Sequence, residues 1–155
     1  MHNKQQGFTL IELVVVIVIL GLLAATALPK FIDVTTDARV ASVQGVAGGL
    51  RAAAALGQAQ YVVNGDKAAT SISMGGQTVT VLDENTYAGM GGRPDGQTTG
   101  IRRAMPDPDG FSITGGGTAT AAVTYQPTNG GSATCQVVYT PNAAGDPVAV
   151  TTGGC

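Results

Sequence analysis

Few side chains of this 155-residue chain could carry out acid–base or nucleophilic chemistry. His2 is the only histidine, so a Ser-His-Asp triad, a Cys-His pair or a histidine metal site would depend on it alone. Paired carboxylates occur at Asp83-Glu84 and at Asp107-Pro108-Asp109. Carboxylates at neighbouring strand or turn positions, with no apolar pocket around them, are usually solvated. The residue types therefore predict that the protein is not an enzyme and uses no cofactor.

The segment Asp107-Pro108-Asp109-Gly110 resembles the start of a calcium loop, in which Asp107 and Asp109 would be the ligands. Phe111 stands where the third ligand belongs, and the later glutamate of such a loop is lacking. A turn is therefore the favoured interpretation, no metal is predicted, and calcium is kept as a weak alternative. We expect the nearby Arg102-Arg103 pair to be solvated close to these aspartates.

The composition excludes several classes of protein. Hydrophobic residues make up 44% of the chain and charged residues only 12%, against about a quarter in ordinary soluble domains. The formal net charge of −2 provides no basic surface for nucleic acid. The glycine runs at residues 89–92 and 115–117 do not match a nucleotide-binding fingerprint, and we expect flexible loops there. The length fits one domain once the apolar start is set aside.

Two cysteines stand late in the chain, at Cys135 and Cys155. In a chain that is exported, an isolated pair indicates one disulfide, whereas a zinc site would normally require four ligands. The bond would close a loop of about twenty residues and stabilise the fold by roughly 3 kcal/mol in the chain-entropy model. We therefore predict that the C-terminus is attached to a strand.

The N-terminus is directed to a membrane. Residues 1–7 are polar, whereas residues 13–28 contain no charge, and Glu12 interrupts the apolar run near its start. Such a segment is typical of a secretory signal peptide cut after Ala25-Thr26-Ala27, or of an ordinary single-span anchor. Both interpretations leave Glu12 unexplained, since a carboxylate inside an apolar membrane helix costs on the order of 2.5 to 3.5 kcal/mol.

A cut between Gly7 and Phe8 gives Glu12 a partner. The cut creates an ammonium group on Phe8, and Glu12 lies four residues further along the same helix. The carboxylate and the ammonium can then neutralise one another, within one copy or between neighbouring copies that stack in register. The cut would also remove His2 from the mature chain. This third interpretation is the one we favour.

The residues Gly7-Phe8-Thr9-Leu10-Ile11-Glu12, followed by Leu13-Val14-Val15-Val16-Ile17, resemble the class III leader and helix start of type IV pilins and of type II secretion pseudopilins. The short leader and the phenylalanine at the new terminus are similar to the type IVa class. Residues 22–39 are more similar to the mannose-sensitive haemagglutinin branch than to pseudopilins. The likeness is strong over residues 7–39 and weak beyond about residue 63.

This resemblance implies how the chain is processed and assembled. A prepilin peptidase would cut after Gly7 and methylate Phe8, and Thr9 and Glu12 would act in assembly. Gly21 and Pro29 would bound a stretch of helix that loosens in the filament. Cys135 and Cys155 match the position of the disulfide-bounded loop that pilins carry at the C-terminus.

The resemblance also implies partners and a location. The subunit would be a homopolymer in a helical filament, built with inner-membrane assembly machinery and minor pilins. It would lie in the inner membrane of a bacterium before assembly and in an extracellular pilus afterwards. Adhesion and surface attachment are implied by the family branch, with motility or biofilm formation as further possibilities. A pseudopilin of a type II secretion system is the alternative within the family, and a secreted binding domain behind an ordinary signal peptide is the alternative of another class.

A single long helix is predicted over residues 8–63. Pro29 cannot donate to the helical ladder, so we expect a kink or local opening near Leu28. The second half carries an apolar stripe that would pack on a sheet, whereas Arg39, Gln44 and Arg51 mark the opposite face. The members of this stripe are Val43, Val46, Leu50, Ala53 and Leu56. Four glycines weaken this half, and we attribute them to close approach of helix and sheet rather than to a helix that stretches.

Beyond Asn64-Gly65-Asp66 the chain changes to short Thr- and Val-rich runs that are typical of strands. Residues 83–110 contain many Gly and Pro residues and predict a long surface connection. The predicted strands are 78–82, 111–114, 118–125, 136–140 and 148–151. The expected fold is therefore α+β, a pilin fold in which a long N-terminal helix has a protruding hydrophobic half and a second half packed on an antiparallel sheet. Its parts are a leader (1–7), a transmembrane or filament-core helix (8–29), an amphipathic half (30–63) and a β-rich head (64–155).

Overall fold

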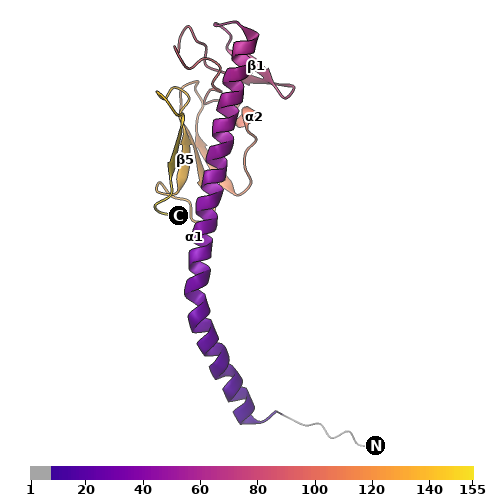
Figure 1. The fold of residues 1–155 in the computed structure, drawn as a ribbon, viewed down its shortest axis with the longest axis vertical. Helices are drawn as coiled ribbons and strands as arrows, with labels where there is room; N and C mark the ends of the chain where they lie inside the picture. Colours follow the sequence, from indigo (N-terminus) through magenta and orange to yellow (C-terminus); the bar gives the residue numbers. More distant parts are fainter. Residues whose placement is uncertain (1–7) are drawn as a thin grey trace, which may run out of the picture. The chain divides into compact units, whose positions relative to one another are not determined.

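The structure, a computed structural model, describes residues 8–155, without the side chains of residues 27–33 (Figure 1). One long helix precedes a set of short strands, which confirms the predicted α+β class. The elements are α1 (Leu10–Asn64), β1 (Ser71–Met74), β2 (Gln77–Thr80), α2 (Ile101–Ala104), β3 (Phe111–Gly115), β4 (Val123–Pro127), β5 (Gln136–Tyr139) and β6 (Val148–Thr151). The chain divides into two units, residues 1–38 and 39–155, which are considered separately below.

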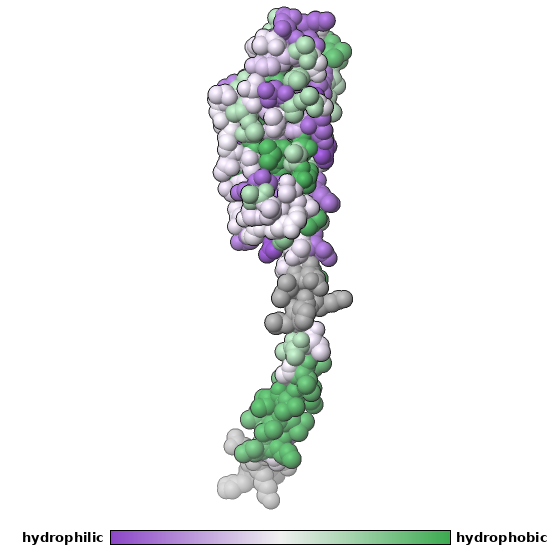
Figure 2. Space-filling model, turned by 90° about the vertical axis from the view of Figure 1, so that its left-hand side faces the viewer, coloured by the Kyte–Doolittle hydropathy of each residue, from purple (hydrophilic) through white to green (hydrophobic). Residues whose placement is uncertain are grey.

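In the first unit α1 begins with a long apolar run, and the face of this run that is seen in Figure 2 is hydrophobic. Leu10 is 80% exposed, and the bulky residues up to Leu23 are all at least 42% exposed. No element of the described chain combines the length and the apolar character that a membrane-crossing helix needs. The predicted leader lies outside the described residues. α1 is one continuous helix from Leu10 to Asn64, and the kink predicted near Leu28 stays a prediction.

In the second unit, α1 packs one face against the sheet. The buried positions are Val43, Val46, Ala47, Leu50, Ala53 and Ala54. The prediction that Leu56 continues this stripe is wrong, because its side chain is 62% exposed. A helix turns once in 3.6 residues, so the inward direction after Leu50 passes through Ala53 and Ala54 to Gly57 and Tyr61.

A four-stranded antiparallel sheet, in the order β3-β4-β5-β6, forms the main layer against the helix. Alternate residues of β4 and β5 point into the core, which is why Val123, Tyr125, Val137 and Tyr139 are fully buried. A separate hairpin of β1 and β2 contributes a second, smaller core around Tyr61. The sequence prediction missed both β1 and α2.

The predicted strands agree with β3, β5 and β6 to within one residue and with β2 to within two. The predicted strand 118–125 begins too early, because β4 starts at Val123. Gly115, Gly116 and Gly117 all have positive φ angles, so the chain turns sharply before β4. Residues 116–122 then form a loop whose backbone bonds to Gly96.

The prediction that residues 83–110 form a surface connection is wrong for its middle part. Residues 92–96 are buried, and Arg93 and Asp95 are only 8% and 3% exposed. The phenol of Tyr139 donates to the carbonyl oxygen of Pro94 at 2.6 Å, which ties this stretch to the sheet. Buried polar groups of this kind are stable only with hydrogen-bond partners, so the contacts are specific and do not follow from composition.

The helix glycines fall into two groups. A methyl group added at Gly57 would lie 2.6 Å from the carbonyl oxygen of Gly92, and one at Gly49 would lie 2.8 Å from the sulfur of Met105. At Gly45 and Gly48 a methyl group would meet no atom within 4 Å. Close approach therefore explains Gly49 and Gly57 but not the other two. The predicted approach of helix and sheet is only partly correct, because the atoms approached belong to residues 92, 94 and 105, which lie outside the strands.

This contrast gives a matched pair of substitutions. Gly57→Ala is expected to lower the melting temperature, because a clash with backbone atoms costs about 1 to 3 kcal/mol and exceeds the gain in helix propensity. Gly45→Ala is expected to raise it, since alanine is favoured by roughly 1 kcal/mol at an open helix position. Circular dichroism of the full chain in detergent measures both. Equal stabilisation by the two substitutions would contradict the close approach at Gly57.

Candidate functional site

The first candidate site is the start of α1. Thr9 directly precedes the helix, and its Oγ1 accepts the backbone N–H of Glu12 at 3.3 Å. This is an N-cap, which typically contributes about 1 kcal/mol to helix stability. The spacing Thr-x-x-Glu is also that of a capping box, a signal that stands in the sequence itself. Thr9 therefore caps the helix, a structural role in addition to the role in assembly that the sequence predicts.

Glu12 lies in the first helical turn with its side chain exposed, and Phe8 is 87% exposed. A carboxylate at this end of a helix is favoured by the macrodipole. Gly21 is exposed, with no atom within 4 Å of an added methyl group. Gly7 and the side chain of Pro29 lie outside the described residues. The assigned roles of Phe8, Glu12, Gly21 and Pro29 therefore stay predictions.

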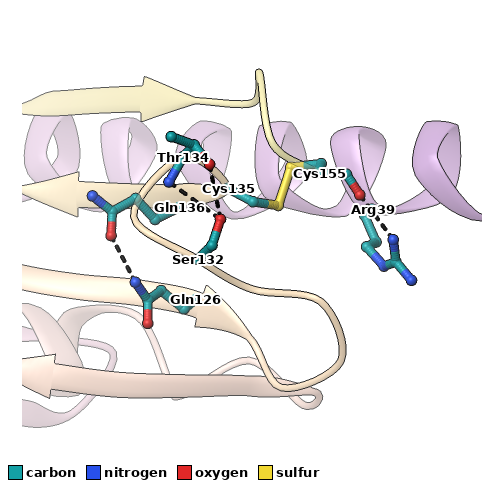
Figure 3. Close-up of a disulfide and its surroundings, with 7 residues drawn as sticks. All are labelled: Arg39, Gln126, Ser132, Thr134, Cys135, Gln136 and Cys155. Atoms are coloured by element: carbon teal, nitrogen blue, oxygen red, sulfur yellow. Dashed lines mark hydrogen bonds between the residues drawn. A yellow bond between two sulfur atoms is a disulfide. The ribbon is translucent and has the colours of Figure 1, made fainter.

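The second candidate site is the C-terminal segment, residues 135–155, which a disulfide encloses (Figure 3). Cys135 and Cys155 are bonded, with their Cα atoms 4.8 Å apart, as the sequence predicts. Cys135 is fully buried among the residues of the main core, and Cys155 packs on that core from the edge. The last residue of the chain is thus joined covalently to the start of β5.

Three arginines from outside this segment donate hydrogen bonds to its backbone. Arg39 of α1 donates to the carbonyl oxygen of Cys155 at 2.8 Å (Figure 3). Arg51, further along α1, donates to the carbonyl oxygen of Val148 at 3.2 Å. Arg93 donates to the carbonyl oxygens of Pro141, Ala143 and Gly145. We call these three arginines the arginine clamp.

The clamp changes two interpretations made from the sequence. The prediction that Arg39 and Arg51 mark a face opposite the sheet is wrong, because both side chains reach the C-terminal segment. The sequence prediction missed Arg93, although Arg93-Pro94-Asp95 holds the only charges in residues 85–101. Such a lone charged pair in an uncharged glycine-rich run is the signal that could have indicated a buried role.

Arg51 also forms an ion pair with Asp146, whose Oδ2 lies 2.8 Å from the Nε atom. The hydrogen bond from Arg51 lowers the pKa of Asp146, and the backbone N–H of Val148 acts in the same direction. Both side chains are about half exposed, so the pair contributes at most about 1 kcal/mol. Because the folded-state pKa is lowered, this contribution is present above the usual aspartate range and is lost in acid.

The core tyrosines behave in the opposite sense. Burial raises the pKa of Tyr125 to about 12, and burial likewise raises the pKa of Tyr139. A raised pKa means that the fold favours the neutral phenol, so this contribution to stability is lost when the pH rises beyond the tyrosine range. The hydroxyl of Tyr125 has no hydrogen-bond partner within the described residues.

The remaining acidic candidates are engaged in shaping loops. Asp83 accepts the backbone N–H of Thr86, and Glu84 accepts those of Gly89 and Gly91, which lowers the pKa of both carboxyl groups. Carboxylates that accept backbone N–H groups in this way hold the conformation of the surrounding loop. The residues that the structure describes contain no group of three or more acidic, cysteine or histidine side chains arranged for a metal.

The weak calcium alternative gains no support from the structure. Both carboxylate oxygens of Asp107 accept hydrogen bonds from Arg102, so this ligand is already paired with a cation. Arg103 donates instead to the carbonyl oxygen of Thr78. Arg102 therefore lies beside Asp107, as predicted, but is only partly exposed. Arg103 is exposed, as predicted, but bonds to the backbone of β2 rather than to an aspartate.

Known proteins resemble this chain most clearly at the start of α1. Residues 2–28 match the family model described as the prokaryotic N-terminal methylation motif. The chain is 33% identical over 124 residues to the type IV major fimbrial protein FimA of Dichelobacter nodosus, an alignment that covers 77% of this chain and 72% of that protein. The chain belongs to the type IV pilin family.

Two further relatives of this pilin match over shorter segments. It is 47% identical over 57 residues to the type IV narrow pilus major component PilA5 of Thermus thermophilus, over 37% of this chain and 49% of that protein. It is 49% identical over 53 residues to the type IV major pilin protein PilE1 of Neisseria gonorrhoeae, over 34% of this chain and 32% of that protein. The matched part thus spans half or less of these two relatives. No solved structure matches this pilin significantly.

Proposed function

We propose that this pilin is a structural subunit of a type IV pilus, and that it assembles with copies of itself into an extracellular filament. The observation that carries the proposal is the helix start. From Leu10 to Thr26 every side chain of α1 is exposed, although almost all are apolar. A helix that is apolar all round needs cover on all sides, and a bundle of such helices provides it.

Processing would precede assembly. In the proposed sequence of events, prepilin peptidase cuts after Gly7 and methylates Phe8, and the apolar helix 8–29 holds the subunit in the inner membrane with its head outside the cytoplasm. Assembly machinery and minor pilins then transfer the subunit into the filament. The C-terminal disulfide fits this route, because disulfides form in oxidising compartments outside the cytoplasm.

Adhesion to surfaces is a finer part of the proposal and rests on the likeness of residues 22–39 to the mannose-sensitive haemagglutinin branch. The described head offers a shallow pocket of about 310 Å³ beside Tyr61 and Lys67. Its two carboxylates are already engaged, since Glu84 accepts two backbone N–H groups and Asp66 accepts one. We therefore assign attachment to the filament surface as a whole rather than to this pocket.

Mass spectrometry of the mature protein tests processing. A chain that begins at methylated Phe8 is expected, whereas a start at Leu28 would show an ordinary signal peptide and contradict the proposal. Electron microscopy of sheared surface filaments, with a deletion strain as control, tests assembly. Filaments that contain this chain are expected. A correctly processed chain that forms no surface filament would instead indicate a pseudopilin of a secretion system.

A further inference from the structure

The two edge strands of the main sheet differ in how their backbone groups are satisfied. β6 and β3 are the outer strands, and each has a neighbour on one side only. An edge strand presents unpaired N–H and C=O groups that can pair with another chain, and proteins usually block such edges with charges, prolines or bulges. In this pilin, charged side chains block the start of one edge, and none blocks the other.

The blocked edge is β6, where the block lies at the first residue, Val148. The backbone N–H of Thr140, directly after β5, donates to the carbonyl oxygen of Pro147, directly before β6. Hydrogen-bonded and non-bonded pairs alternate along an antiparallel ladder, so the N–H and C=O groups of Val148 point away from β5. Both of these backbone groups have partners, since the N–H of Val148 donates to the carboxylate of Asp146 at 3.0 Å and its carbonyl oxygen accepts from Arg51 at 3.2 Å. The ion pair of Arg51 and Asp146 therefore covers the beginning of this edge.

The open edge is β3. The backbone N–H of Thr128 donates to the carbonyl oxygen of Gly110, and that of Gly116 donates to the carbonyl oxygen of Ala122. Because bonded pairs alternate in an antiparallel ladder, the backbone groups of even-numbered β3 residues bond to β4 and those of odd-numbered residues point outward. The outward N–H and C=O groups of Ile113 have no hydrogen-bond partner among residues 8–155. No charged side chain occurs in residues 111–141, and Ser112 and Thr114 are exposed. β3 therefore contains no charge, no proline and no bulge that would block this edge.

We propose that β3 pairs edge to edge with β3 of a second copy of this pilin, and that this pairing joins neighbouring filaments side by side. The strand is complementary to itself, because an antiparallel pair centred on Ile113 places Ser112 of each copy opposite Thr114 of the other. Neither strand brings a charge that the pairing would bury or oppose.

The symmetry of the contact places the second copy in another filament. Two identical strands that pair antiparallel are related by a two-fold axis, whereas the copies along one polar filament are related by a screw rotation. A five-residue edge buries too little surface for a stable dimer of free subunits. A filament presents the edge many times, so weak contacts add up to lateral adhesion. This inference rests on the proposed function for its consequence, but the pairing itself can be tested without filaments.

The direct test uses the full mature chain with a photo-reactive phenylalanine derivative at position 114. Illumination of the chain in detergent, at high concentration, is expected to give a covalent dimer whose cross-link maps to β3 of the second copy. Absence of a dimer, or a cross-link elsewhere in the head, would overturn the pairing. The result does not depend on whether filaments form, so it separates this inference from the proposed function.

The second test places charge on the open edge. Thr114→Lys and Thr114→Glu are each expected to abolish most of the bundling of purified filaments in low-speed sedimentation. Residue 114 faces Ser112 of the other copy, so the two like charges lie diagonally across the strand pair, within reach of one another. An equimolar mixture of the two filaments is expected to bundle again. The control is Thr151→Lys on β6, which makes the same change on the blocked edge and should leave bundling unchanged. Equal loss in the control, or no recovery in the mixture, would overturn the proposal.

Discussion

Glu12→Ala is expected to abolish surface filaments while leaving processing intact. Glu12 lies in the first turn of α1, and the ammonium group created on Phe8 by the proposed cut lies four residues before it. In an apolar bundle, removal of one partner of a buried ion pair typically costs about 3 to 5 kcal/mol, because the other charge is left uncompensated. The cost would recur at every subunit of the filament.

Electron microscopy of sheared filaments measures this effect, and mass spectrometry of the same cells shows whether Phe8 is still the methylated terminus. Glu12→Gln keeps the size of the side chain and removes only its charge, so it should fail as the alanine variant does. The cap bond does not involve the carboxylate, since Thr9 accepts the backbone N–H of residue 12. Normal filament numbers with either variant would disprove the assigned role.

Loss of the disulfide is the second large effect expected. Cys135→Ser should lower the free energy of unfolding by roughly 3 kcal/mol through the loss of the cross-link, and should remove assembled filaments. Cys135 is also fully buried, so its substitution places a hydroxyl group in the core. Melting of the full chain in detergent, with and without reductant, measures the cross-link alone.

Cys155→Ser is the matched variant, because Cys155 lies at the edge of the core and its loss breaks the same bond. If the bond is what matters, Cys155→Ser, reduced wild type and Cys135→Ser should all melt well below the oxidised protein. If only Cys135→Ser is destabilised, the packing of residue 135 is responsible. Normal piliation in both variants would contradict the predicted need for the bond.

The sequence was sufficient where a single physical rule decides the outcome. The helix, the sites of β3 and β6, and the disulfide follow from apolar periodicity, β-branched runs between glycines, and the presence of an isolated pair of cysteines. The error at Leu56 arose from spacings of three residues, which drift away from the 3.6-residue turn after Leu50. Gly57 lies on the buried face but lacks the side chain by which such faces are recognised in a sequence.

The interior of residues 83–110 was not predictable in the same way. Its glycines and prolines are typical of surface loops, yet Arg93 and Asp95 are buried there through bonds to partners elsewhere in the chain. Arg93 donates to carbonyl oxygens about fifty residues away, and no local pattern encodes such a contact. The cap at Thr9 is the reverse case, since its four-residue signal is local and could have been predicted from the sequence.

The arginine clamp has a consequence for how this pilin can change over generations. Arg39 and Arg93 hold the C-terminal segment by its carbonyl oxygens, which every amino acid supplies, and the disulfide fixes its end. Exposed side chains between β5 and β6, such as Asn142 and Ala144, take no part in these bonds. Mutations there can accumulate without loss of the fold, so the outer surface of the segment is free to diversify while its backbone stays in place.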